Sequence, residues 1–494
     1  MPDRNRNILL SCGVLLLATC VCVSILLTGG AGIFLRAISQ PNPGTPTTQV
    51  QVNATPITLL ATATAVPVIT RAPTAAPVIS VTPGPTAEST PTADKLPLPP
   101  DIAAEMDTIQ AQVEQIRGLP PLQPVERALL SHDQLDKRVR ADFAKDNSPE
   151  DNRKASLLLA SFGLLEPGFD LNSFYQRFLS EQIAGFYDPE AKQMYIVQGQ
   201  SFGGMERMTY SHEFTHALQD QHYDIRNGLR YSSAACKEES ERCAAVQALI
   251  EGDASLAEQA WMIRFATQQD RQDLSDFSKN NSLPIFESAP PFMKDDLLFP
   301  YVQGLEFVQS LYDQNGWESV NDAFANPPVS AEQILHPEKY PQETPVVVQI
   351  LDLKSILGDG WTEVDKGILG EWYTYLMLAD GITPAFRLPQ RTAQQAAKGW
   401  GGDAYSSFEK DGSTVLVLET TWDSAAEAIE FSKAFQIYAN SRWGKQEIRT
   451  DGKMSWSAPG TFSLFSHSQT QTIWIMTPDE QTALAISSAL KGGN

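Results

Sequence analysis

Proline recurs at short intervals throughout residues 41–100, and this feature restricts how the chain can fold more than any other. Because proline fixes φ and lacks an amide hydrogen, such a segment cannot form long helices or paired strands. Its charged side chains are few: Arg71, Glu88, Asp94 and Lys95. The composition predicts a semi-rigid stalk over residues 36–100 rather than a domain of short strands, so that a hydrophobic core begins at Asp101.

The stalk follows an uncharged run over residues 8–35, which Arg4 and Arg6 precede. Roughly 20 apolar residues suffice to cross a bilayer, whereas a cleavable signal peptide has a shorter apolar core before its cleavage site. A lipoprotein signal at Cys20 fits poorly because the apolar run continues beyond it. We therefore expect a cytoplasmic tail over residues 1–7, a transmembrane signal anchor over residues 8–35, and a cell-membrane protein with its folded part outside.

The length and the charge of the chain restrict its domains and its partners. A chain of 494 residues is too long for one ordinary core, and we expect folded domains over residues 101–355 and 356–494. The 37 Lys and Arg side chains against 59 Asp and Glu give a formal net charge of -22, which argues against nucleic acid as a partner. The oligomeric state is left open.

Only two cysteines, Cys236 and Cys243, lie in the part of the chain that is expected to fold. An outward-facing location is oxidising, so we expect these two residues to form a disulfide. On a continuous helix they would be separated by about 10.5 Å of rise, which is beyond the reach of a disulfide. Residues 237–242 are therefore expected to form a loop.

Hydrophobic periodicity and turn residues predict an α+β fold. The first folded domain is expected to be mainly helical with a small sheet. It should contain a hairpin over residues 186–197 with an Asp-Pro turn, and helices over residues 206–223 and about 244–265. The second domain is expected to be a smaller α+β unit. Its predicted strands cover residues 414–418, 462–465 and 473–476.

Two histidines and a glutamate, His212, Glu213 and His216, have a spacing that suits metal chemistry. Residues four apart on a helix are rotated by about 40° and separated by about 6 Å, so His212 and His216 can bind the same ion. Glu213 lies beside the pair, where a carboxylate can take a proton from water that attacks a carbonyl. Tyr210 and Phe214 belong to an apolar stripe on the opposite side of this helix. The pattern predicts a Zn2+ site with Glu213 as general base.

The motif and a later segment resemble the gluzincin branch of the zinc metallopeptidases. The resemblance covers about residues 183–265 and rests on two stretches, His212-Glu213-Phe214-Thr215-His216-Ala217-Leu218-Gln219-Asp220 and Ala248-Leu249-Ile250-Glu251-Gly252-Asp253-Ala254. It implies a zincin-like metallopeptidase domain in which Glu251 is the third protein ligand. It also implies that the strand over residues 192–197 pairs with an extended peptide substrate. One departure is Ser255, which stands where this family often has an orienting Asp; Asp253 is the available substitute.

The residues by themselves leave two candidates for the third ligand, Glu251 and Glu258. A catalytic zinc site has three protein ligands and keeps the fourth position for water, so one further side chain is required. The two glutamates lie on nearly the same helix face but about 10 Å apart along the axis, so both cannot bind a single ion. Gly252 costs about 1 kcal/mol inside a helix, which suggests a close approach to another backbone or to the site. The resemblance to gluzincins decides in favour of Glu251.

A peptidase also needs a hydrogen-bond donor for the oxyanion. His336 is our candidate for this role and Tyr340 is the second. Ser330 and Gln333 form a predicted capping box, and Pro337 ends the short helix directly after His336. Local features favour the alternative, in which His336 satisfies carbonyl groups of the last helical turn.

Together these features predict a membrane-anchored, extracytoplasmic zinc metallopeptidase that acts on proteins or peptides. The alternative is a non-catalytic surface binding protein that keeps a structural zinc site. Glu213 favours catalysis, because this residue is not needed to hold a metal ion.

Overall fold

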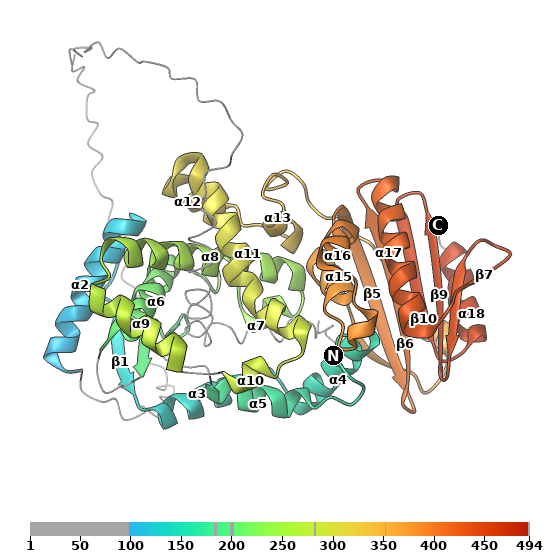
Figure 1. Cartoon of the computed structure of the whole chain (residues 1–494), viewed down its shortest axis with the longest axis horizontal. Helices are drawn as coiled ribbons and strands as arrows, with labels where there is room; N and C mark the ends of the chain where they lie inside the picture. The colour runs from blue at the N-terminus through green and yellow to red at the C-terminus, as the bar shows by residue number, and fades with distance from the viewer. Residues whose placement is uncertain (1–97, 182–184, 198–201, 281–282, 351, 493–494) are drawn as a thin grey trace, which may run out of the picture. The chain divides into compact units, whose positions relative to one another are not determined.

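A computed structural model of the chain describes residues 98–492, apart from 182–184, 198–201, 281–282 and 351 (Figure 1). The described residues have a mixed α+β architecture, which confirms the predicted α+β class. A three-stranded sheet lies among the helices up to residue 350, and a seven-stranded antiparallel sheet follows. We call residues 98–350 the helical part and residues 352–492 the sheet part.

The helical part contains most of the helices of the described chain. Its elements are α2 (Pro100–Arg117), β1 (Glu126–Leu130), α3 (His132–Asp146), α4 (Pro149–Ser161), α5 (Leu171–Glu181), β2 (Gly185–Asp188), β3 (Gln193–Val197), α6 (Gly204–Tyr223), α7 (Ser233–Cys236), α8 (Ser240–Arg264), α9 (Gln268–Asn280), α10 (Pro284–Glu287), α11 (Pro291–Asn315), α12 (Trp317–Ala325) and α13 (Ala331–Leu335). The predicted hairpin is confirmed as β2 and β3, and the two predicted helices are confirmed as α6 and α8.

The sheet part alternates strands with helices that cover both faces of the sheet. Its elements are α14 (Lys354–Leu357), β4 (Thr362–Gly367), α15 (Gly370–Ala379), η2 (Pro384–Phe386), α16 (Gln390–Ala397), β5 (Trp400–Lys410), β6 (Ser413–Trp422), α17 (Ala425–Trp443), β7 (Glu447–Ile448), β8 (Met454–Ala458), β9 (Thr461–Ser468), β10 (Gln471–Thr477) and α18 (Glu480–Gly492). The three predicted strands are confirmed as parts of β6, β9 and β10.

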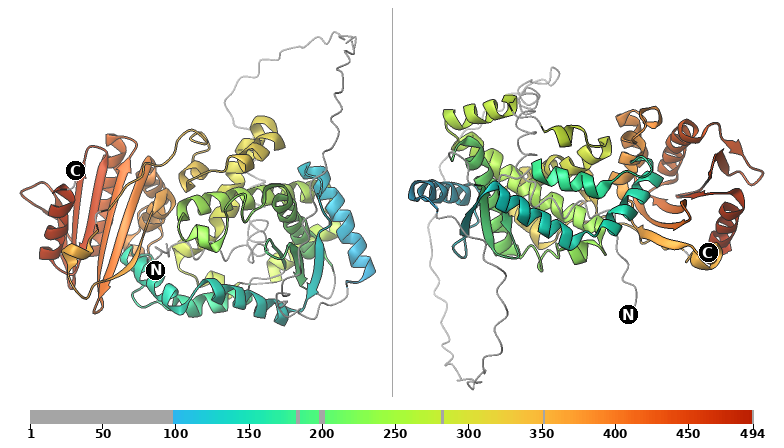
Figure 2. Two further views of the ribbon diagram at one scale, coloured as in Figure 1. Left: turned by 180° about the vertical axis from the view of Figure 1, so that it is seen from behind. Right: turned by 90° about the horizontal axis from the view of Figure 1, so that it is seen from below.

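The seven strands have the order β4-β5-β6-β10-β9-β8-β7, and successive side chains along each strand point to opposite faces. On β6, Leu416 and Leu418 join a cluster with Phe435 of α17, whereas Val415 and Val417 join a cluster with α18. Helices α17 and α18 therefore cover opposite faces of the sheet (Figure 2). This packing explains the alternating apolar residues of these strands.

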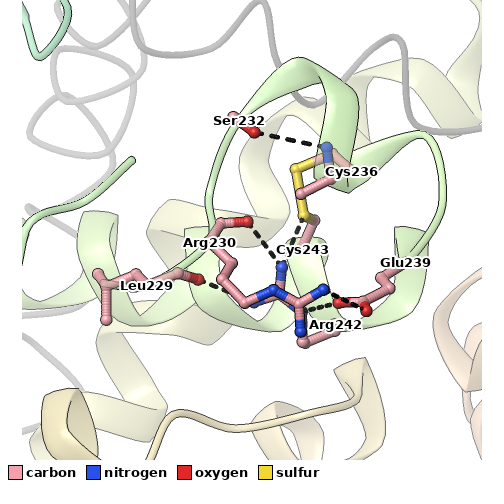
Figure 3. Close-up of a disulfide and its surroundings, with 8 residues drawn as sticks. Leu229, Arg230, Ser232, Cys236, Glu239, Arg242 and Cys243 are labelled. Carbon is pink, nitrogen blue, oxygen red and sulfur yellow. Dashed lines mark hydrogen bonds and ion pairs between the residues drawn. A yellow bond between two sulfur atoms is a disulfide. The ribbon is translucent and has the colours of Figure 1, made fainter. Parts of the chain in front are cut away.

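The predicted disulfide between Cys236 and Cys243 is present (Figure 3). Cys236 is the last residue of α7 and Cys243 lies in the first turn of α8, with 5.4 Å between their Cα atoms. The expected loop is shorter than predicted, because α8 already begins at Ser240. Arg242 holds this end of α8 by donating hydrogen bonds to the carbonyl oxygens of Leu229 and Arg230 (Figure 3).

The predictions that concern a membrane require correction. Among the described residues, no helix combines the length and the apolar character needed to cross a bilayer. This finding overturns the transmembrane signal anchor, the membrane as a partner and the cell-membrane localisation; the segment over residues 8–35 that suggested them lies outside the described residues. The absence of charge in a sequence is not by itself sufficient grounds for a spanning helix.

Candidate metal centre

Helix α6 is buried along most of its length, and its packing fixes the direction of its polar side chains. On one side Tyr210 and Phe214 enter a hydrophobic cluster with Ile109 of α2 and Trp261 of α8, as the apolar stripe predicted. His212 and His216 point to the other side of the helix and are only 1% exposed each. These two side chains face the interior between α6 and α8 and not open solvent.

Helix α8 reaches this position through a close contact with α11. A Cβ atom built on Gly252 would lie 2.2 Å from the carbonyl oxygen of Gly304 in α11. A Cβ atom on Gly304 would in turn lie 2.2 Å from the carbonyl oxygen of Ala248. The expectation that Gly252 marks a close approach to another backbone is confirmed, and the partner is α11. Glu251, the residue before this glycine, is thereby held in the interior and is fully buried.

The three predicted ligands lie together in the structure. Glu251 Oε2 is 3.2 Å from His212 Nε2 and 3.3 Å from His216 Nε2, and the three donor atoms lie within 4.8 Å of one another. Donor atoms at about 2.0–2.1 Å from a tetrahedral ion are about 3.3–3.4 Å apart, so these separations fit a zinc ion. The donor set of two imidazole nitrogens and one carboxylate oxygen is also one that zinc accepts. Burial alone would raise the pKa of Glu251, but His216 and His212 lower it to about 2.

The outer nitrogen of each histidine ring is held by a different acceptor. Glu258 Oε2 lies 3.1 Å from His212 Nδ1, and Gln219 Oε1 lies 2.8 Å from His216 Nδ1. Glu258, the other candidate for third ligand, therefore contacts the ring nitrogen opposite the one that faces Glu251. Asp253 accepts a hydrogen bond of 2.7 Å from Gln219, so it contributes to the orienting network that Ser255 had left in doubt. Sequence reasoning missed the roles of Glu258 and Gln219.

Glu213 lies beside the ligands but turns toward the small sheet. Its Oε2 accepts a hydrogen bond of 2.8 Å from the backbone N–H of Tyr187 in β2. Its Oε1 is buried and has no hydrogen-bond partner among the described residues. Burial raises the pKa of Glu213, and the neighbouring His216 and His212 oppose this shift. A buried carboxylate with a raised pKa binds a proton more tightly than an exposed one, so Glu213 is suited to accept a proton from water.

The implied role of the strand over residues 192–197 in pairing with a substrate is wrong. This strand, β3, is the central strand of the order β1-β3-β2, and Gln193 to Ile196 are paired on both sides. The sheet edge that reaches Glu213 belongs to β2, whose outer edge is unpaired in the described chain. The sequence could not show this, because β1 comes from more than sixty residues earlier in the chain.

His336 and Tyr340 make contacts away from the three ligands. His336 Nε2 lies 2.8 Å from Glu371 Oε1 of α15, and the Tyr340 hydroxyl donates to the carbonyl oxygen of Asn326. Burial lowers the pKa of His336, but the hydrogen bond and charge of Glu371 outweigh this effect and raise it. An aromatic side chain that does lie beside a ligand is Tyr301 of α11, whose ring centroid is 6.4 Å from that of His212. No local pattern around Tyr301 indicated this position.

A second cluster of three carboxylates surrounds the ammonium group of a lysine rather than a metal ion. Glu332, Glu343 and Asp423 offer oxygen atoms within 4.8 Å of one another. Lys339 Nζ lies 2.6, 2.7 and 2.6 Å from these three carboxylates. The lysine therefore already neutralises this group, which links the helical part to the loop after β6.

Comparison with known proteins gives one match, which lies in the sheet part. Residues 357–487 match a domain of unknown function (DUF8575). This match falls within the predicted second domain and does not include the candidate metal centre. No curated protein and no solved structure matches the chain.

Proposed function

We propose that this protein is a zinc-dependent peptidase of the gluzincin type, and that His212, His216 and Glu251 hold its metal ion. The observation that carries the proposal is the convergence of Nε2, Nε2 and Oε2 at separations of 3.2 and 3.3 Å about the Glu251 oxygen. A bound zinc ion supplies Lewis-acid activation of water and of the substrate carbonyl. The remaining chemistry belongs to side chains of this chain.

Glu213 is the proposed general base. Its free Oε1 accepts the proton of the attacking water, and the same carboxyl group then delivers that proton to the leaving amine. The hydrogen bond from Tyr187 N fixes Oε2, so that only Oε1 remains available for the transfer. Because burial raises the pKa of Glu213, its carboxylate is a stronger base than that of an exposed glutamate.

The outer edge of β2 is the proposed support for an extended substrate. An edge strand presents unpaired backbone groups that can pair with another chain. Tyr187 N points from this edge to Glu213, so a peptide along β2 would run past the proposed base. This assignment replaces the internal strand β3.

A structural zinc site is the second candidate, because the three ligands are almost completely buried. His212 and His216 are each 1% exposed, and Glu251 is 0% exposed. Structural sites are closed, whereas catalytic sites keep one position open to water and substrate. A site that only holds a metal ion does not require Glu213. The effect of substituting Glu213 on cleavage therefore distinguishes a peptidase from a protein with a structural zinc site.

The experiment compares zinc content and casein cleavage of the full-length chain with those of Glu213→Gln. If the protein is a peptidase, Glu213→Gln should keep its zinc while its rate of casein cleavage falls by orders of magnitude. Glu206→Gln is the matched control, since Glu206 lies on the same helix and in the described chain accepts a capping bond from Gly203 N, which glutamine can also accept. Equal cleavage by Glu213→Gln and the unchanged chain contradicts the proposal, and so does a zinc-loaded protein that cleaves nothing.

A further inference from the structure

Among the described residues, the carboxyl group of Glu213 is oriented by one hydrogen bond. Its Oε2 accepts from the backbone N–H of Tyr187 at 2.8 Å, and its buried Oε1 has no hydrogen-bond partner in this part of the chain. The last torsion of a glutamate side chain is broad, so packing around the stem does not by itself fix where the oxygens point. The direction of Oε1 therefore depends on where Tyr187 holds its N–H.

The side chain of Tyr187 is held at its other end by the same helix. Its hydroxyl donates a hydrogen bond of 2.8 Å to Asp220 Oδ2. Burial and the charge of Asp220 raise the pKa of this hydroxyl, which therefore remains a neutral donor. Asp220 follows Glu213 by seven residues on α6, so the two lie on nearly the same helix face about 10.5 Å apart. Tyr187 thus extends along two turns of α6 and is attached at both ends.

Asp220 stands where local helix stability does not favour it. It lies in the last turn of α6, where a negative charge opposes the helix dipole, and its side chain is 0% exposed. Besides the Tyr187 hydroxyl, it accepts hydrogen bonds of 2.6 Å from Lys192 Nζ and 3.1 Å from Ile225 N. Lys192 lies in the turn between β2 and β3, so Asp220 attaches this hairpin to α6 at two points.

We propose that Tyr187, anchored by Asp220, is a positioning residue that sets the orientation of the Glu213 carboxyl group. This inference rests on the proposed function for the role of Glu213 as a base. The pairing of β2 with β3 over Gly185 to Asp188 does not involve the Tyr187 hydroxyl. Loss of this hydroxyl should therefore disturb the base and leave the sheet edge that is proposed to support the substrate.

The first test is hydrogen–deuterium exchange at the backbone amide of residue 187 in the full-length chain, measured by mass spectrometry. Exchange at this amide reports its bond to Glu213. Tyr187→Phe should raise the rate about tenfold, because the residue loses its second attachment to α6. Tyr195→Phe is the matched control, since it removes a buried hydroxyl of the same sheet that bonds to Gln193. It should leave the rate within about twofold.

The second test is steady-state cleavage of fluorescently labelled casein. Tyr187→Phe should lower kcat about 10- to 100-fold and leave KM within about twofold, because the base is misaligned while the substrate edge remains. Zinc content should not change, since Tyr187 is not a ligand. Tyr195→Phe should keep both kinetic constants within about twofold. Replacement of Tyr187 by p-aminophenylalanine keeps a donor for Asp220 and should restore most of kcat.

The outcomes separate the anchored tyrosine from the proposed function. If Tyr187→Phe does not fold, Asp220→Leu removes the acceptor instead of the donor and should give the same faster exchange at Tyr187. An exchange rate within about twofold of that of the unchanged chain overturns the anchor, and so does faster exchange with an unchanged kcat overturn the positioning of the base. A chain that cleaves no casein overturns the proposed function, while faster exchange in Tyr187→Phe still establishes that Tyr187 and Asp220 orient Glu213.

Discussion

The two ligand histidines differ in the chemistry of their outer partners. His212 is held by a carboxylate, Glu258, and His216 by a neutral amide, Gln219. A carboxylate partner raises the basicity of the ring nitrogen that binds metal more than an amide does. We therefore expect His212 to be the stronger ligand of the pair.

The roles of the two buried glutamates on α8 lead to a prediction about zinc retention. Glu251→Ala should lose most of its bound zinc during dialysis against a mild chelator, because a donor atom disappears. Glu258→Ala should keep zinc but bind it about 10- to 100-fold more weakly, because only the orientation of His212 is lost. Elemental analysis of the dialysed proteins measures the retained zinc.

The reverse order of these two variants would transfer the role of ligand to Glu258. Glu241→Ala is a matched control for the loss of a buried glutamate from α8, because its contact is with Ala331 N and not with a histidine. It should retain zinc like the unchanged chain.

The sequence was sufficient for residues whose role depends on local spacing. His212, Glu213 and His216 belong to one helix, so their relation could be predicted from the helix repeat. Glu251 required the resemblance as well. Gln219 and its contact with Asp253 were missed because the contact joins α6 to α8, and its geometry is set by how the two helices pack.

At the scale of elements, the centre depends on the close passage of α8 and α11. Gly252 and Gly304 allow the two backbones to approach, and this contact holds Glu251 in the interior. The sequence indicated that Gly252 has a close neighbour but could not identify Gly304, which lies about fifty residues later. The predicted pairing of β3 with a substrate was wrong for the same reason, because its neighbour β1 is distant in sequence.

The disulfide at the start of α8 should contribute measurably to stability. It closes a short loop in the unfolded chain, and its entropic effect is about 2–3 kcal/mol. The variant with both Cys236→Ser and Cys243→Ser should lose about this much free energy of unfolding, measured with a denaturant. Reductant should lower the stability of the unchanged chain to that of the variant and leave the variant itself unaffected. Equal stability of the two oxidised proteins would contradict this prediction.

At the scale of the whole described chain, two buried acids lie where the helical part meets the sheet part. Glu241 of α8 accepts a hydrogen bond of 2.7 Å from Ala331 N, and its Oε2 lies against Gly370 at the start of α15. Asp403 of β5 accepts hydrogen bonds from Leu369 N and Gly370 N. Burial raises the pKa of Glu241 to about 8 and that of Asp403 to about 6.

These shifts predict how stability changes with pH. Because the pKa of Glu241 is higher in the folded chain than its ordinary value of 4.5, the folded state binds more protons between about pH 4.5 and pH 8. The contribution of Glu241 to stability is therefore present below about pH 4.5 and is lost as pH rises to about 8. Glu241→Gln stays neutral, so its free energy of unfolding relative to the unchanged chain should rise by about 1 kcal/mol or more from pH 5 to pH 8.

Denaturant unfolding at the two pH values, with metal removed by a chelator, measures this difference. Metal must be absent because zinc binding is itself dependent on pH. Glu114→Gln, which removes a charge from the exposed side of α2, is the control for a change of net charge. If the free energies of unfolding of Glu241→Gln and the unchanged chain differ by the same amount at pH 5 and pH 8, Glu241 is ionised in the folded protein at both pH values.

The sequence predicted the α+β class and several of the helices and strands, but not the contact between the two parts. Side chains of both parts share one hydrophobic cluster, in which the rings of Phe162 and Tyr405 lie 5.9 Å apart. Neither residue stands in a local pattern that indicates the other. The domain boundary between residues 355 and 356 stays a prediction. Contacts cross it, because His336 on one side is hydrogen-bonded to Glu371 on the other.

Titration of zinc into the metal-free, full-length chain tests the central claim most directly, with bound zinc and casein cleavage followed in the same samples. The account predicts that cleavage rises in proportion to bound zinc and reaches its maximum at one ion per chain. Glu213→Gln should bind the same single ion and remain inactive. Cleavage that does not depend on zinc, or full occupancy without cleavage in the unchanged chain, would contradict the assignment of this centre as a peptidase site.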